Sequence, residues 1–197
     1  DIIEKVSGSS LDDLCNRWIF NPIDMNNTFY NPDASLKSKI APTEEDDYFR
    51  NRLLQGEVHD ENAYLLGGVS GHAGIFSNAY DLAKYAQLFL NEGTWLGNRI
   101  FSDYIVDEFT SRQNLPKGSD YALGWDTPSI NGKSSAGDFF SNKSYGHLGF
   151  TGTSLWIDSR RDIIVVLLTN RVHPTRMKKG MYSLRRNFHT EIMKAIL

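Results

Sequence analysis

The sequence predicts an α+β domain in which helices pack on an antiparallel sheet. Three observations support this class. Apolar residues recur at helical spacing in the first half of the chain, short runs of aromatic and β-branched residues follow Gly118, and a helical pattern returns after Met181. Helices, then paired strands, then a covering helix is the order of a layered α+β domain. The 197 residues are enough for one such domain.

Helices are expected at four places before the strands. Residues 1–6, stopped by Gly8, resemble the tail of a helix, and Ser10 with Asp13 caps a helix over residues 11–20. Residues 21–55 are rich in Pro, Asn and Asp and are predicted as loop. Two later helices follow Ser77 and Ser102; the first ends at Gly93, and their apolar positions are Leu82, Tyr85, Ala86, Phe89, Leu90, Ile105, Val106 and Phe109.

Four short runs predict the sheet, and a final helix is expected to cover it. The runs are residues 121–125, 143–147, 153–157 and 163–169. A five-residue polar connector joins the last two, which should therefore pair antiparallel. The final helix has an apolar stripe formed by Met181, Leu184, Phe188, Ile192, Ala195 and Ile196.

Composition and charge exclude several function classes. Residues 160–197 hold nine Lys and Arg against two Asp and Glu, but no nucleic-acid module accompanies them, so we expect no nucleic-acid partner. We place five of these cations on the solvent face of a terminal helix: Arg176, Lys178, Lys179, Arg185 and Arg186. The longest apolar run, residues 163–168, is too short to span a membrane.

Cys15 is the only cysteine, which excludes a disulfide framework and a cysteine metal site. It shares a predicted helix face with Leu11, Leu14 and Trp18. A buried structural thiol is therefore expected at this position, and not a nucleophile.

Two glycine-rich segments could carry chemistry. Residues 146–152 place His147 among three glycines between two predicted strands, which indicates either a close approach to a ligand or a plain tight turn. Residues 58–74 contain His59, Asp60, Asn62 and His72. The two histidines lack helical spacing, so we predict a coiled loop and no metal; the loop either lines a site or is only structural.

Residues 146–152 are followed by a tryptophan-containing predicted strand and then by an apolar one. This arrangement resembles the third motif of the class C β-lactamase and DD-peptidase superfamily. Other blocks agree in order: residues 2–8, 19–25, 74–83 and 121–125. The resemblance implies a partial β-lactamase/transpeptidase-like fold. It extends to β-lactamase-like domains fused to family 3 glycoside hydrolases, which would make such a hydrolase a partner.

Two motifs of that superfamily are absent. No serine here is followed three residues later by lysine, as in Ser-x-x-Lys, and Tyr-x-Asn does not occur. Both motifs precede residues 2–8 in the family. Residues 1–197 are therefore expected to be the C-terminal portion of one such domain, lacking the segment that carries both motifs.

The resemblance implies acyl transfer through a serine ester without a cofactor. His147 would stand where the family often has lysine, Leu148 and Gly149 would contact substrate, and the Phe150 backbone N–H would be one oxyanion donor. His59, Asp60, Asn62 and His72 would contact substrate from the cleft-side loop. Leu148 replaces a Thr or Ser hydroxyl, which favours an ester or peptide over a β-lactam.

Two functions follow as alternatives. The first is a serine acyl hydrolase of the bacterial periplasm or extracellular space that acts on a small-molecule or peptidoglycan-type substrate. The second is a non-catalytic module that binds envelope glycan or peptide. Under either, we expect this chain alone not to turn over esters, peptides or β-lactams, and to pair with the missing part of its own domain.

Overall fold

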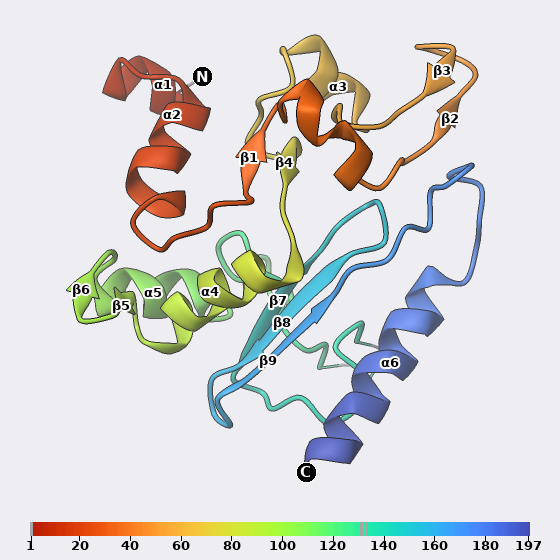
Figure 1. The fold of residues 1–197 in the computed structure, drawn as a ribbon. Coiled ribbons are helices and arrows are strands. Elements are labelled where there is room, and N and C mark those ends of the chain that lie inside the picture. Colours follow the sequence, from red (N-terminus) through yellow and green to blue (C-terminus); the bar gives the residue numbers. More distant parts are fainter. Residues whose placement is uncertain (1, 131, 133) are drawn as a thin grey trace. The chain divides into compact units, whose positions relative to one another are not determined.

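The computed structural model describes residues 2–130, 132 and 134–197 (Figure 1). The chain divides into two compact units. Unit 1 consists of residues 1–84 and 169–178, and unit 2 consists of residues 85–168 and 179–197. Helices and antiparallel strands occur as separate segments in each unit, which confirms the α+β class. Among the described residues, no helix is long and apolar enough to cross a membrane.

Unit 1 begins with the predicted helices. Helix α1 spans Ile2–Ser7, and α2 spans Leu11–Cys15, where the Ser10 side chain accepts from the Asp13 backbone N–H as expected. The helix continues as a π-helical turn, η1, over Asn16–Phe20, so the predicted limits hold but the second half is wider than an α-helix. Trp18 on this turn is exposed and Cys15 is only half-buried, so the predicted buried face was wrong at these two positions.

The rest of unit 1 consists of short elements in long connections. The 3-10 helix η2 spans Ala34–Lys39, and two small antiparallel pairs join β1 to β4 and β2 to β3. The loop expected at residues 58–74 contains a helix, because Asp60 caps α3 by accepting from the Ala63 N–H. The strands and this helix are β1 Phe29–Tyr30, β2 Glu45–Asp46, β3 Arg52–Leu53, α3 Glu61–Leu65 and β4 Ile75–Phe76.

Helix α4, Ala79–Leu90, begins in unit 1 and ends in unit 2. Its cap is Asn78, whose side chain accepts from the Asp81 N–H at 2.9 Å, and not Ser77 as predicted. The Ser77 hydroxyl instead hydrogen bonds to Thr28 Oγ1 at 2.7 Å. Gly93 ends the helix as expected, in a left-handed conformation with its N–H bonded to the Leu88 carbonyl.

Unit 2 contains a three-stranded antiparallel sheet in the order β7-β8-β9. Residues 121–125 do not form the fourth strand that was predicted. The chain turns there, with Ala122 N–H bonded to the Trp125 carbonyl, and only Asp126 bridges to Gly146. The elements of the unit after α4 are β5 Thr94–Trp95, β6 Asn98–Arg99, α5 Asp103–Thr110, β7 Ser144–Leu148, β8 Ser154–Asp158, β9 Ile163–Leu167 and α6 Met181–Ile196.

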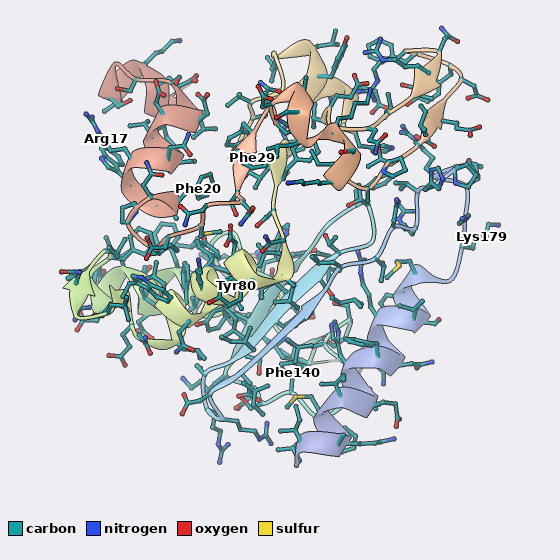
Figure 2. All side chains as sticks on the ribbon, in the orientation of Figure 1. Arg17, Phe20, Phe29, Tyr80, Phe140 and Lys179 are labelled. Atoms are coloured by element: carbon teal, nitrogen blue, oxygen red, sulfur yellow. The ribbon has the colours of Figure 1, made fainter. Side chains whose placement is uncertain are left out.

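Both faces of this sheet are covered. Leu155 and Ile157 of β8 pack in a cluster with Phe89 of α4 and Val106 of α5. Trp156 points to the opposite face, where it packs with Phe140, which is labelled in Figure 2, and with side chains of α6 that include Met193. The alternation of side chains along a strand therefore builds two half-cores on one central strand. The prediction that the last helix packs on the sheet is confirmed.

The buried face of α6 is shifted by about one residue along the sequence relative to the predicted face. Leu184 and Ile196, predicted as core, are 48% and 56% exposed. The buried positions are Arg185, His189, Thr190 and Met193, and three of them, Arg185, His189 and Met193, repeat at the four-residue spacing of one helix face. An arginine and a histidine occupy this face because each finds hydrogen-bond partners there.

Candidate active site

The end of β7 presents the histidine motif. His147 pairs with Leu155 and Leu148 with Ser154 across the ladder, and the His147 side chain is exposed. Gly146, one residue earlier, lies flat against β8. A Cβ at this position would lie 2.4 Å from the Trp156 ring and 2.5 Å from the Leu155 carbonyl oxygen. Glycine is therefore required for β7 to sit this close to Trp156.

A tight turn follows. The Gly149 N–H donates to the Thr153 carbonyl at 2.8 Å, and the Gly152 N–H donates to the Gly149 carbonyl at 3.1 Å. Gly152 has a φ of 115°, which a side chain would strain. Phe150, at the tip of the turn, is exposed. The backbone that carries the predicted oxyanion donor is thus fixed by two hydrogen bonds of its own.

Arg185 holds this turn from α6. Its Nη2 donates to the Gly149 carbonyl at 2.6 Å and to the Thr153 carbonyl at 2.8 Å, and the residue is only 8% exposed. Hydrogen bonds from a charged donor in a buried position are stronger than neutral ones. The prediction that Arg185 faces solvent is therefore wrong. The signal that could have identified it is its place in the four-residue series Arg185, His189 and Met193.

His189 supports the start of β8 in the same way. Its Nδ1 lies 2.6 Å from the Ser135 carbonyl, which can only accept, so Nδ1 carries the proton and Nε2 accepts from Ser154 Oγ at 3.2 Å. Burial lowers the pKa of the His189 imidazole, and the Arg185 charge acts in the same direction. His189 is therefore a neutral structural side chain.

Asp126 lies beside β7 on the side away from β8. Its N–H and carbonyl bond to the Gly146 carbonyl and N–H at 2.7 and 2.9 Å. Burial raises the pKa of the Asp126 carboxyl group, while the His147 charge acts against that increase. No sequence pattern assigned Asp126 to a site, although its carboxyl group interacts electrostatically with His147.

The predicted substrate-binding residues of unit 1 divide into two environments. Asp60 Oδ1 lies 2.9 Å from His72 Nε2, Ser70 Oγ lies 2.8 Å from His72 Nδ1, and Asn62 is exposed on α3. The pKa of the Asp60 carboxyl group is lowered, mainly by the hydrogen bond from the Ala63 N–H and also by His72. These residues form an exposed polar surface.

His59, in contrast, is buried. Its Nε2 lies 2.9 Å from Glu44 Oε2, and Arg176 binds both Glu44 and Glu61 at 2.6 Å. Burial lowers the pKa of the His59 imidazole, with the charges of Arg176 and Arg50 contributing, although the hydrogen bond to Glu44 opposes the change. This ionic cluster fastens the segment 169–178 to the base of the loop, so the structure places His59 in the support of the loop.

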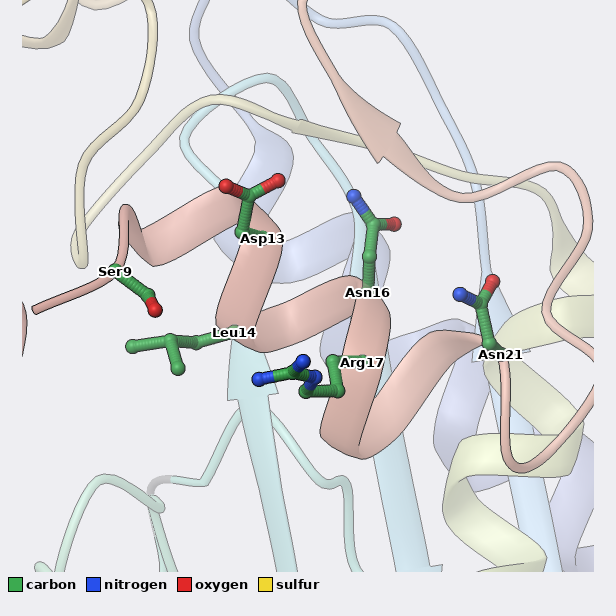
Figure 3. Close-up of a pocket in the computed structure, with 6 residues that line it drawn as sticks. All are labelled: Ser9, Asp13, Leu14, Asn16, Arg17 and Asn21. Carbon is green, nitrogen blue, oxygen red and sulfur yellow. The ribbon is translucent and has the colours of Figure 1, made fainter. Parts of the chain in front are cut away.

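The predicted site residues therefore form two groups, each brought together within its own unit. His147, Leu148, Gly149 and Phe150 follow one another in unit 2, while His59, Asp60, Asn62 and His72 belong to unit 1. Within the described residues, no group of three or more His, Cys, Asp or Glu side chains could hold a metal ion. A hollow in unit 1 contains none of the predicted residues (Figure 3); it is lined by Ser9, Asp13, Leu14, Asn16, Arg17 and Asn21.

The sequence model of the family named Beta-lactamase matches residues 1–189. This chain belongs to the β-lactamase family. Among curated relatives, an N-acetylmuramyl-L-alanine amidase of Bacillus subtilis (strain 168) is 38% identical over 191 residues, covering 87% of this chain and 42% of the relative. A protein assigned as a D-alanyl-D-alanine carboxypeptidase of Salmonella gallinarum is 36% identical over 189 residues, covering 87% of this chain and 43% of the relative.

Solved structures share the fold. A β-lactamase of Mycobacterium bovis superposes with a TM-score of 0.64 at 19% identity, covering 99% of this chain and 58% of that one. The hydrolase EstCE1 superposes with a TM-score of 0.62 at 18% identity, covering 95% and 52%. The fold is thus a partial β-lactamase/transpeptidase-like fold. The chain spans less than half the length of the curated relatives that it matches.

Proposed function

We propose that this chain is the C-terminal portion of a serine acyl hydrolase that acts on peptidoglycan-type peptide or amide bonds. The observation that carries the proposal is the turn at residues 149–153, which Arg185 clamps directly after the exposed His147. Family membership supplies the reaction class, and the names of the amidase and carboxypeptidase relatives support the substrate class.

In this proposal, the chain supplies electrostatics and the nucleophile comes from Ser-x-x-Lys in the part of the domain that the chain does not span. The Phe150 N–H stabilises the oxyanion of the tetrahedral intermediate, because the clamped turn holds that dipole in place before the reaction. His147 offers a donor or a positive charge to a substrate carboxylate. Leu148 and Gly149 contact substrate along the β7 edge, and the lack of a hydroxyl on Leu148 disfavours β-lactams.

The loop of unit 1 contributes substrate contacts in the proposal. Asp60, Asn62 and His72 present exposed polar groups, whereas His59 acts indirectly by anchoring the loop through Glu44. The cell envelope is the location that fits such substrates, either periplasmic or extracellular. A fused family 3 glycoside hydrolase remains a prediction.

The test uses a protein extended upstream through Ser-x-x-Lys and a peptide that ends in D-alanyl-D-alanine. We expect release of D-alanine, with kcat/KM reduced roughly 100-fold or more in His147→Ala, the scale of one lost electrostatic donor. Asn62→Ala, which removes an exposed contact, should raise KM with little change in kcat. Binding of the peptide without turnover by the extended protein would favour the alternative, a non-catalytic peptide-binding module.

A further inference from the structure

The loop after α3 joins a serine, a histidine and a carboxylate in one hydrogen-bonded chain. Ser70 Oγ lies 2.8 Å from His72 Nδ1, and His72 Nε2 lies 2.9 Å from Asp60 Oδ1. An ionised carboxylate only accepts, so in the neutral ring Nε2 carries the proton and Nδ1 accepts from the Ser70 hydroxyl. A nucleophile, a base and an orienting group are thus within hydrogen-bond reach of one another.

Contacts with other segments of unit 1 hold this arrangement. Asp60 is fixed as the cap of α3 by its hydrogen bond from the Ala63 N–H at 2.8 Å. The Tyr30 hydroxyl donates to the Ser70 carbonyl at 3.1 Å, and the Asn31 side chain donates to the Gly67 carbonyl at 2.8 Å. Both the carboxylate and the serine are therefore positioned by the fold and not only by each other.

We propose that Ser70, activated by His72 and oriented by Asp60, is a nucleophile that accepts acyl groups from small activated esters. The expectation that this chain does not turn over esters rested on the absence of a serine with a lysine at helical spacing. A histidine two residues along a glycine-rich loop lies outside that pattern. The proposal requires neither Ser-x-x-Lys nor β7, and it gives Asp60 and His72 a role in addition to the substrate contacts of the proposed function.

The step is an ordinary acyl transfer. Ser70 Oγ attacks the ester carbonyl carbon while its proton moves to His72 Nδ1, and Asp60 stabilises the resulting imidazolium. The ester C–O bond then breaks, the proton leaves with the departing alkoxide or phenoxide, and water hydrolyses the acyl-serine with His72 as base. The His72 and Asp60 side chains are 52% and 36% exposed, so water screens their interaction. This screening weakens the activation of Ser70, so substrates with good leaving groups are favoured over peptides and β-lactams.

The experiment treats this chain with p-nitrophenyl acetate and with a fluorophosphonate, and maps the adduct by mass spectrometry. We expect one adduct, on Ser70, and none in Ser70→Ala. His72→Gln should slow labelling by roughly 100-fold, the lower end for loss of a general base. Asp60→Asn, which can still accept from the Ala63 N–H, should slow it less. The matched control is Ser183→Ala, an exposed serine on α6, which should label at the wild-type rate.

An adduct on a different serine, or equal labelling of His72→Gln and wild type, would overturn the proposal. Nitrogen-15 NMR of the unmodified chain gives a second readout that needs no variant. We expect the Nε2–H tautomer for neutral His72; the Nδ1–H tautomer would make Ser70 an acceptor and would also overturn it. A failure of the D-alanine assay would leave both readouts unaffected, so the two proposals fail separately.

Discussion

The guanidinium group of Arg185 is buried and hydrogen bonds to two backbone carbonyl groups of the turn that carries Phe150. We predict that Arg185→Met, which keeps much of the side-chain volume, lowers the free energy of unfolding by about 2–3 kcal/mol, because a charge-assisted hydrogen bond is lost and carbonyls are left buried. Urea denaturation measures this. Arg186→Met is the control: its ion pair with Asp138 is partly exposed, and the expected loss is below about 1 kcal/mol. Equal losses would show that the Arg185 contacts do not stabilise the turn.

His189 gives a pH dependence with a definite sign. Its pKa is lowered in the folded chain, so the unfolded chain takes up the proton first as the pH falls. The stability that neutral His189 contributes is complete above about pH 6.5 and is lost as the pH falls below it. We predict that wild type exceeds His189→Gln in unfolding free energy by more at about pH 7.5 than at about pH 5. A pH-independent difference would contradict this; His59 is common to both proteins and cancels.

At the scale of elements, Gly146 sets how closely β7 approaches β8. Gly146→Ala should lower the free energy of unfolding by about 1–3 kcal/mol, because its Cβ would overlap Trp156 and the Leu155 carbonyl. Gly71→Ala is the control, since a Cβ there meets nothing within 4 Å. Thermal or urea unfolding of both variants tests the prediction. A Gly146→Ala protein as stable as the control would mean that β7 can shift away from Trp156.

The elements also show what local sequence patterns can predict. Helices with side-chain caps, such as those after Ser10 and Ser102, and the β8–β9 hairpin were predicted because their signals are local. Residues 121–125 have strand-forming side chains but turn back on themselves, since the Ala122 to Trp125 hydrogen bond competes with pairing. The rotation of α6 depends on partners for Arg185 and His189 that lie far away in the sequence, so apolar periodicity alone could not reveal it.

At the scale of the whole chain, family and fold class were predictable, because ordered motif blocks extend over most of the sequence. The candidate site could be predicted from the sequence only in part. The His147 motif was found from its glycines, but its support by Arg185 and its neighbour Asp126 depend on tertiary contacts. His59 was predicted to contact substrate because of its place in the loop. Its burial against Glu44 depends instead on residues 169–178, which rejoin unit 1 late in the sequence. Ser70 was missed for another reason: its partner His72 is only two residues away, whereas the family motif requires a lysine three residues after the serine.

The central claim is that this chain carries the His147 edge and an oxyanion donor, while the acylated serine of the family lies in a segment that it does not span. Labelling with a fluorescent penicillin, followed by peptide mapping, tests it most directly on this chain and on a protein extended upstream through Ser-x-x-Lys. We predict that a saturating concentration of the penicillin gives an adduct on the Ser-x-x-Lys serine of the extended protein, formed slowly because Leu148 lacks the hydroxyl, and no adduct on this chain, Ser70 included. A penicillin adduct on any serine of the chain alone would contradict the claim.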